Sequence, residues 1–278
     1  PRPSAQGRRA GGDARRVRPT NRLLLAAMRR LPVEWGAGRR LVFRRLQRAG
    51  AFPVTTQIFG RPIRLHGDNT SERKFLVQPR AYNRRDFSFL TRAMPETGGT
   101  FVDIGANAGV YSFAVAAHAG EGSCILCVEP NPAMAARIEI NLQHLNDFGG
   151  EGVRVLVDCR AVGEGNGDAR LAVDRGPGAA GLTTDPSGMT VPVADLGSIL
   201  DDHGMEQVDA LKIDIEGFED RALLPFFETA PASRWPRAMV VEHCSRDGWQ
   251  TDLVGALGQR GYTVRGRTRN NLFLTWRD

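Results

Sequence analysis

The 278-residue chain has a net charge of +6 and an ordinary hydrophobic share of 41%, enough for one α/β domain with additions. Its longest apolar run near the start, residues 23–28, is far too short to span a membrane, and no small-residue cleavage pattern accompanies it. A transmembrane helix and a secretory signal are therefore not expected.

The first 50 residues carry the positive charge. They hold 14 arginines against Asp13 and Glu34, a local charge of +12, so the remaining residues carry −6. A nucleic-acid groove in the main body is therefore not favoured. Residues 1–20 are rich in Arg, Gly and Pro and are predicted to be a disordered lead. Contact of this lead with RNA or with an anionic membrane surface is the alternative.

Residues 21–99 are predicted to form an N-terminal unit of helices and a hairpin. Leucines at helical spacing among arginines over 21–49 are interrupted by Pro32 and by glycines, which indicates two short helices. Alternation over 54–66 predicts a small hairpin, and a further helix is expected over 84–94.

The strands and helices predicted from residue 100 onward alternate, which indicates a mostly parallel sheet with helices on both faces and a single domain over 100–278. The predicted strands are 100–104, 124–128, 153–157, 209–215, 238–243 and 272–276. The predicted helices are 108–118, 132–146, 194–203, 218–227 and 248–260. Between 164 and 192 two short strands, 169–173 and 189–193, surround a glycine-rich loop that is a candidate lid or substrate contact.

The first strand of this domain runs into a glycine-rich turn. The sequence FVDIGANAG occupies residues 101–109, and the next strand ends on Glu129 within CILCVEPNP. Open α/β sheets hold adenosine-containing ligands with this arrangement, because the glycine turn lets the backbone approach and the acid accepts hydrogen bonds from the ribose.

The spacing of the turn indicates which ligand is bound. Gly105 and Gly109 are four residues apart with Asn107 between them, so the G-x-G-x-x-G of dinucleotide-binding folds is missing, as is the phosphate-binding loop. An open turn with Asp103 at the strand end suits a small zwitterion better than a diphosphate. This favours S-adenosylmethionine over NAD.

A second charged segment, LKIDIEGFE, begins at residue 211 within the predicted strand 209–215. Lys212, Asp214 and Glu216 would share one face of that strand, although central parallel strands are usually apolar on both faces. Asp214 and Glu216 would lie at the carboxyl end, where such sheets bind ligands. Both are candidate catalytic residues, with a structural ion pair to Lys212 as the alternative.

The next predicted strand ends in Glu242 and His243, at the same edge of the sheet as Asp214. Such a cluster could deprotonate a hydroxyl, so His243 is a further candidate catalytic residue, with a purely structural histidine as the alternative. The three side chains could also hold a divalent cation, but a metal is not favoured.

The four cysteines are interpreted as small buried hydrophobic residues in a reducing, cytoplasmic environment. Cys124 and Cys127 form a C-x-x-C inside a predicted strand. Because residues three apart on a strand point to opposite faces, this pair cannot bind one metal ion or close a disulfide. Cys159 and Cys244 lie at strand ends.

The motifs together resemble those of the FkbM-type S-adenosylmethionine-dependent methyltransferases. The resemblance is carried, in order, by GTFVDIGANAGVYS, VEPNP, NLQHLN, AVG and LKIDIEGFE, and covers roughly residues 54–276. It implies an α/β class I methyltransferase fold, which is Rossmann-like. Its seven-stranded, mostly parallel sheet would have helices on both faces and an antiparallel last strand, here 270–276. The N-terminal helices and hairpin would be an extension of this fold.

The resemblance also implies a cofactor site. The residues assigned to S-adenosylmethionine are Asp103, Gly105, Asn107 and Gly109 at the methionine end, Glu129 and Asn131 at the ribose, Asp158 and Ala161 at the adenine, and Asp214 at the reacting end. Glu216 would face the reacting end as well. The sequence departs from the family at 83–86, where glutamates are common, in the arginine-rich lead, and in the segment 176–181, which is unusually rich in Gly and Ala.

The resemblance implies methylation of a hydroxyl group on a small molecule or a sugar, as in natural-product or glycan O-methylation. Asp214, helped by Glu216 or His243, is expected to orient and deprotonate the acceptor, with Lys212 fixing the carboxylate. The alternatives are an RNA methyltransferase guided by the basic lead, a non-catalytic cofactor-binding module and an NAD-linked oxidoreductase.

Overall fold

The computed structural model describes residues 19–30, 36–146, 152–172 and 181–276. The strands of its main sheet are β3 (Thr100–Ile104), β4 (Cys124–Val128), β5 (Arg154–Asp158), β10 (Ala210–Ile213), β11 (Ala238–Glu242), β12 (Tyr262–Arg267) and β13 (Asn271–Trp276). These seven strands have the order β12-β13-β11-β10-β3-β4-β5. Only β13 runs antiparallel to its neighbours. The predicted sheet and its antiparallel last strand are confirmed.

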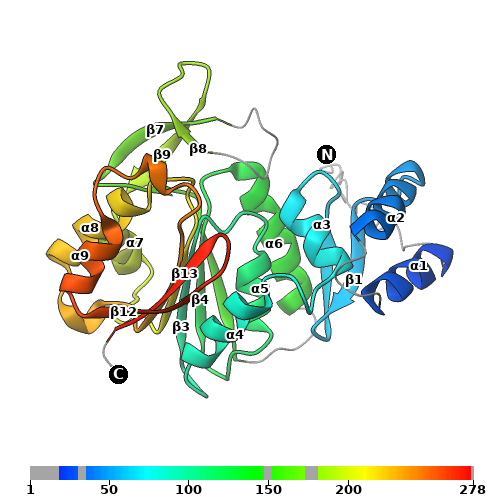
Figure 1. The fold of residues 1–278 in the computed structure, drawn as a ribbon, viewed down its shortest axis with the longest axis horizontal. Coiled ribbons are helices and arrows are strands. Elements are labelled where there is room, and N and C mark those ends of the chain that lie inside the picture. The colour runs from blue at the N-terminus through cyan, green and yellow to red at the C-terminus, as the bar shows by residue number, and fades with distance from the viewer. Residues whose placement is uncertain (1–18, 31–35, 147–151, 173–180, 277–278) are drawn as a thin grey trace, which may run out of the picture.

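Helices cover both faces of the main sheet (Figure 1). One face carries α4 (Arg84–Ala93), α5 (Val110–Ala116) and α6 (Pro132–Asn146), and the other carries α7 (Leu196–Asp202), α8 (Glu219–Thr229) and α9 (Leu253–Gln259). The interior strand β4 is buried at every position because both of its faces are covered. Cys127 contributes to the core on the first face and Cys124 to the core on the second, which confirms that the C-x-x-C pair is split across the sheet.

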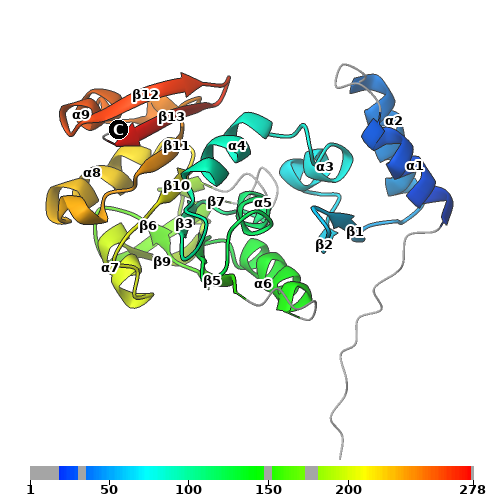
Figure 2. The ribbon, with the colours of Figure 1, turned by 90° about the horizontal axis from the view of Figure 1, so that it is seen from below.

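The N-terminal part consists of α1 (Pro19–Arg30), α2 (Gly36–Arg48), the hairpin β1 (Val54–Ile58) and β2 (Arg61–Leu65), and α3 (Thr70–Val77). Figure 2 shows α1 and α2 as the helices farthest from the main sheet. The two helices and the hairpin were predicted, and α3 was not. Asn69 caps α3, accepting hydrogen bonds from the backbone N–H groups of Ser71 (2.8 Å) and Glu72 (3.4 Å).

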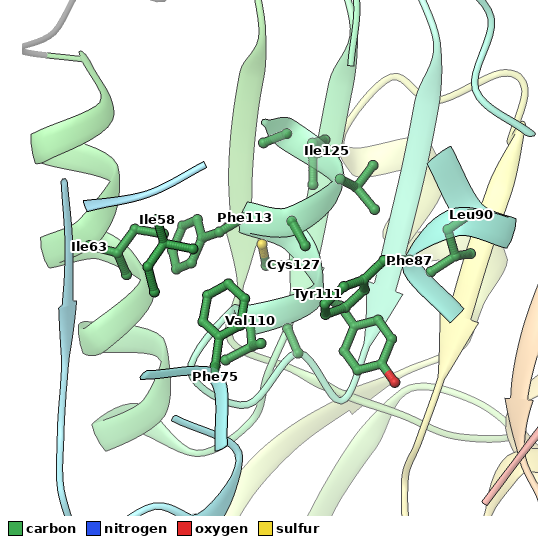
Figure 3. Close-up of a cluster of buried hydrophobic side chains, with 14 of the residues drawn as sticks. Ile58, Ile63, Phe75, Phe87, Leu90, Val110, Tyr111, Phe113, Ile125 and Cys127 are labelled. Carbon is green, nitrogen blue, oxygen red and sulfur yellow. The ribbon is translucent and has the colours of Figure 1, made fainter. Parts of the chain in front are cut away.

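The hydrophobic core is continuous from the N-terminal part into the sheet. Ile58 and Ile63 of the hairpin and Phe75 of α3 belong to the same buried cluster as Phe113 of α5 and Ile125 of β4 (Figure 3). The cluster contains residues from both sides of residue 99, where the sequence predicts a domain boundary. The division into 21–99 and 100–278 stays a prediction.

Polar contacts also join α6 to the N-terminal part. The amide of Asn141 pairs with both backbone groups of Arg64, accepting from its N–H at 2.7 Å and donating to its C=O at 3.0 Å. The Arg137 guanidinium bridges Glu72 at 2.5 Å and Asp68 at 2.7 Å. Glu72 is fully buried, so this ion pair replaces its solvation.

A small second sheet stands beside the carboxyl ends of the main strands (Figure 1). It contains β6 (Ala161–Val162), β7 (Gly167–Ala172), β8 (Gly181–Thr183) and β9 (Met189–Ala194), in the order β6-β9-β7-β8. β7 and β9 correspond to the two predicted short strands, whereas β6 and β8 were not predicted. Residues 173–180, which include most of the expected glycine-rich lid, lie outside the described residues.

Several predicted bounds need correction. β10 ends at Ile213 rather than at 215, and β12 was missed because its alternation is weak and its last residues are exposed. α9 begins at Leu253 rather than at 248, because a short 3-10 turn precedes it and Asp252 caps it through the N–H of Gly255. α1 begins at Pro19, inside the predicted lead. The remainder of the lead, 1–18, lies outside the described residues.

The expectation that all four cysteines are buried is wrong for two of them. Cys159 and Cys244 are exposed, because Cys159 directly follows the end of β5 and Cys244 lies two residues beyond the end of β11. Among the described residues, no helix combines the length and the apolar character needed to cross a membrane.

Candidate functional site

A cavity of about 520 Å³ lies at the carboxyl edge of the main sheet. The turns after β3, β4 and β10 form its floor, the small sheet contributes Leu171 and Leu182, and α3, α4 and the β12–β13 turn complete the wall. Cavities of this size at this edge are where open α/β folds bind small molecules.

The turn after β3 depends on a glycine. Gly105 has φ +70°, and a Cβ atom there would lie 2.0 Å from the backbone oxygen of Asp214. The backbone after β3 therefore touches the backbone after β10 directly. Asn107, further along the turn, also has a positive φ of 54°. Both residues line the cavity.

Glu129, at the end of β4, is held by the same turn. One carboxylate oxygen accepts the Asn107 N–H at 2.7 Å and the other accepts the Asn131 N–H at 2.8 Å. The side chain is only 6% exposed, and burial raises its pKa to about 7 despite these two hydrogen bonds. Glu129 lines the cavity. Each carboxylate oxygen has a further lone pair, so the group can accept hydrogen bonds from two neighbouring hydroxyls.

Asp103, predicted to line the methionine end, does not line the cavity. It is fully buried, and one of its oxygens accepts from the N–H (3.1 Å) and the hydroxyl (2.6 Å) of Ser112. Its other oxygen lies 3.6 Å from the ammonium of Lys212. Asp103 is thus a positioning residue, fixing the start of α5 and the end of the Lys212 side chain.

Lys212 lies between two carboxylates. Its ammonium is 3.6 Å from Asp103 and 3.5 Å from Asp214, and it donates to the backbone oxygen of Gly105 at 3.2 Å. Burial disfavours the charge, but the two carboxylates outweigh it and raise the pKa of Lys212. Asp214 is 37% exposed and lines the cavity. The predicted ion pair and a carboxylate facing the cavity are therefore both present.

Glu216 reaches the cavity from a turn rather than from the predicted strand face. It is exposed and has φ +56°, because β10 has already ended at Ile213. The buried carboxylate of Glu219 holds this turn. It accepts from the N–H of Ile215 at 2.9 Å and of Gly217 at 3.3 Å, and its other oxygen accepts from the Trp249 indole at 2.6 Å.

Two residues assigned to the cofactor from the glycine turn and the ribose segment lie outside the cavity lining. Gly109 starts α5 with φ +77°, and a Cβ there would crowd Phe113 and Ile138. Asn131 accepts the Ala133 N–H at 3.0 Å at the start of α6. Both shape the loops whose other residues face the cavity.

Of the residues predicted near the adenine, one lines the cavity and one does not, and the predicted histidine does not line it either. Ala161 and Arg160 line the cavity, but Asp158 does not. Its carboxylate is bound by Arg160 (2.6 Å) and His203 (2.9 Å), which lower its pKa although burial opposes them. His243 also lies outside the lining, with its ring nitrogen 3.4 Å from the backbone oxygen of Thr268. Its place is against the β12–β13 turn.

A buried polar network in the wall was missed by sequence reasoning. The Asp86 carboxylate accepts from the Tyr111 hydroxyl at 2.7 Å and from the Asn271 amide, and Asn83 donates to the Tyr111 oxygen at 2.6 Å. Burial raises the pKa of Asp86. The sequence marked 83–86 only as a departure. The observable signal was an acid and a tyrosine on faces otherwise occupied by apolar residues.

Glu242 is buried beside Asp214 but is not part of the lining. Burial, followed by the charge of Asp214, raises its pKa to about 7, and it accepts a hydrogen bond from the Cys244 thiol. Over the described ranges of the chain, no group of three or more His, Cys, Asp or Glu side chains is placed to hold a metal ion.

The strand order, the antiparallel β13, the glycine turn and the acid after β4 define a class I methyltransferase fold. Residues 103–263 match the sequence model of the methyltransferase FkbM domain. The chain belongs to the FkbM methyltransferase family.

Solved structures with similar folds include methyltransferases from three bacteria. The FkbM methyltransferase of Methylobacillus flagellatus shares 17% identity over 87% of this chain and 60% of its own, with a TM-score of 0.47. An S-adenosylmethionine-dependent O-methyltransferase of Thermotoga maritima shares 14% over 69% of this chain and 64% of its own, with a TM-score of 0.42. A Geobacter sulfurreducens methyltransferase shares 13% over 92% and 95%, with a TM-score of 0.44.

The chain thus spans less than two thirds of the length of the first two of these relatives. The comparison with curated proteins found no match.

Proposed function

We propose that this chain binds S-adenosylmethionine in the cavity and transfers its methyl group to a hydroxyl of a small molecule or sugar. The observation that carries the proposal is that Glu129 and Asp214, from two strands flanking β3, line one cavity. One carboxylate suits a ribose and the other suits an acceptor hydroxyl.

The residues present fit this cofactor. Glu129 is fixed by two backbone N–H groups and keeps lone pairs for the ribose hydroxyls. Gly105 places backbone without a side chain on the cavity floor, Asn107 lines it beside Gly105, and Ala161 provides a small side chain on the side proposed for the adenine. The bound cofactor supplies an electrophilic methyl group on a sulfonium.

The chain's own residues then align the acceptor and take its proton. Asp214 accepts the hydroxyl hydrogen, and Lys212 at 3.5 Å keeps that carboxylate in one orientation. Glu216 lines the same wall as a second acceptor of hydrogen bonds. His243 lies outside the lining, so it acts at most through the β12–β13 turn. Alignment alone contributes several kcal/mol in well-oriented reactions, roughly 7–11.

Titration calorimetry with S-adenosylmethionine and with NAD tests the proposal. Wild-type protein and Glu139→Gln, an exposed acid on α6, are expected to bind the first at micromolar concentration and not the second. Glu129→Gln is expected to bind it at least tenfold more weakly, because a charged acceptor is lost (about 1.5–3 kcal/mol). Binding of NAD, or unchanged binding by Glu129→Gln, would contradict the proposal.

A further inference from the structure

Positively charged side chains from three segments line the cavity. The start of α4 contributes Arg84 and Arg85, α3 contributes Lys74, and the β12–β13 turn contributes Arg269. The start of α4 lies next to β13, because the Arg85 guanidinium is 5.8 Å from the centre of the Phe273 ring. We call Lys74, Arg84 and Arg269 the basic wall.

The side chains of the basic wall have no carboxylate partner within the described part of the chain. Of the other three cations of the lining, Lys212 is paired with Asp103 and Asp214, Arg160 is paired with Asp158 and Asp202, and Arg85 lies over the Phe273 ring. In contrast, Lys74, Arg84 and Arg269 are exposed and form no ion pair there. Their charge is available to a molecule in the cavity.

Overall composition does not account for this arrangement. Residues 51–278 together carry −6, so a set of unpaired cations at a cavity runs against the charge of this part of the chain. The carboxylates of the lining have partners. Asp214 faces Lys212, and Asp86 is bound within the Tyr111 and Asn271 network. Glu129 accepts from two backbone N–H groups, and Glu216 accepts from the Ser245 hydroxyl at 3.4 Å. An anion at the basic wall would meet no free carboxylate in that network.

The chemistry of the wall points to the class of acceptor. Arginine binds phosphate and carboxylate groups through two parallel N–H donors, and lysine adds a point charge. A cavity of about 520 Å³ suits a small molecule rather than a polymer. Resting on the methyl transfer proposed above, we propose that the acceptor is a small hydroxylated molecule bearing a phosphate or carboxylate group. The basic wall holds that group while the hydroxyl lies at Asp214.

The direct test is a calorimetric titration of small anions into the full chain loaded with S-adenosylhomocysteine. Inorganic pyrophosphate is the phosphate probe, glucuronate the carboxylate probe, glucose the uncharged control, and a short single-stranded RNA the polymeric alternative. We expect at least one of the two small anions to bind and glucose not to bind, with an affinity that falls as salt rises. The probe that binds identifies the source of the anionic group.

The double variant Arg84→Gln/Arg269→Gln locates the site. It is expected to lose about tenfold or more in affinity for the small anion, because charge-assisted hydrogen bonds are removed. Arg92→Gln, an exposed arginine further along α4 that does not line the cavity, should bind like wild type. Absence of small-anion binding, equal loss in both variants, or tighter binding of RNA than of pyrophosphate would overturn the inference.

The loading step separates this inference from the function on which it rests. Failure to bind S-adenosylhomocysteine would remove the proposed methyl transfer, whatever the anions do. Normal loading without anion binding would leave methyl transfer in place and remove only the anionic acceptor.

Discussion

Lys212 lies between Asp103 and Asp214, the two acids that the sequence assigned to the methionine end and the reacting end of the cofactor. Asp103 is fully buried and bound to Ser112, whereas Asp214 is partly exposed and lines the cavity. One ammonium thereby contacts a buried carboxylate and a carboxylate that faces the cavity. The motifs predict that both acids matter, but only the packing around Ser112 distinguishes what each one does.

Substitution of Asp214 tests its place in the reaction. Asp214→Asn keeps the size of the side chain but removes the proton acceptor, so single-turnover methyl transfer should fall by about 10²–10⁴-fold. Cofactor binding should change little. Asp168→Asn, on an exposed position of β7, is the matched control. Near-normal turnover of Asp214→Asn would show that this carboxylate does not take the proton.

The raised pKa of Glu129 predicts a pH dependence of cofactor binding. The ionised carboxylate accepts two hydroxyl hydrogens, and protonation removes part of that capacity. With a folded-state pKa of about 7, affinity should fall roughly tenfold between pH 8 and pH 6. Adenosine is the suitable ligand, because it presents the ribose without the titrating amine of the full cofactor.

The same group has the opposite effect on the ligand-free protein. Because burial raises the pKa of Glu129 above its ordinary value, protonation favours the folded state. Its contribution to stability is therefore complete below the unfolded-state pKa of 4.5 and is lost as the pH rises through about 7. Glu129→Gln should flatten both dependences. A pH-independent adenosine affinity in the wild type would contradict the prediction.

At the scale of elements, the turn after β10 shows that the alternation of apolar residues does not predict where a strand ends. Alternation correctly predicts the strand up to Ile213 but extends it too far, because the carboxylate of Glu219 binds the backbone N–H groups of the turn. That contact depends on the register of α8 and on Trp249, far along the chain. Hydrophobic spacing carries no information about such a hydrogen bond.

Glu219 is therefore expected to stabilise the turn. Glu219→Gln keeps one acceptor oxygen but presents an NH₂ group where a second acceptor is needed. The free energy of unfolding should fall by about 1–3 kcal/mol, and more for Glu219→Ala. Urea titration followed by tryptophan fluorescence measures both, since Trp249 reports the lost contact. Glu228→Gln, exposed on the same helix, should be neutral. Equal stability of all three variants would contradict this account.

The glycine turn gives a second test at this scale. Gly105→Ala must meet both a positive φ and a backbone oxygen 2.0 Å from the new Cβ atom, so the turns after β3 and β10 have to separate. Cofactor binding should be lost, or the protein should unfold at markedly lower urea concentration. Gly165→Ala has open space around its Cβ and is the control. Normal binding by Gly105→Ala would show that the two turns need not touch.

At the scale of the molecule, the sequence predicts the sheet better than it predicts what surrounds the sheet. The order of strands and helices from residue 100 onward, and the antiparallel β13, follow from hydrophobic runs and from the family motifs. The wall made by α3, α4 and the β12–β13 turn does not, because its residues are distant in the chain and meet only after folding. This wall was therefore harder to predict than the turns that carry Gly105 and Glu129.

A buried ion pair adds to the hydrophobic core and to the Asn141 contacts in attaching the N-terminal part. Arg137→Leu would remove the guanidinium from the buried carboxylate of Glu72 and leave it only its contacts with His66, so the free energy of unfolding should fall by about 3–5 kcal/mol. Asp68→Asn removes the exposed partner of the same guanidinium and should cost less than about 1 kcal/mol. Urea unfolding compares the two. A similar, small loss in both variants would mean that Glu72 is not held in this way.

The direct backbone contact between Gly105 and Asp214 separates what is fixed in this fold from what can vary. A Cβ atom at Gly105 would clash with the backbone oxygen of Asp214, so the two turns hold the Glu129 side and the Asp214 side of the cavity at a set distance. The walls from α3, α4 and the small sheet lie outside that contact. On the proposed function, exchange of these peripheral segments would give the fold a new substrate while the geometry of methyl transfer is inherited unchanged.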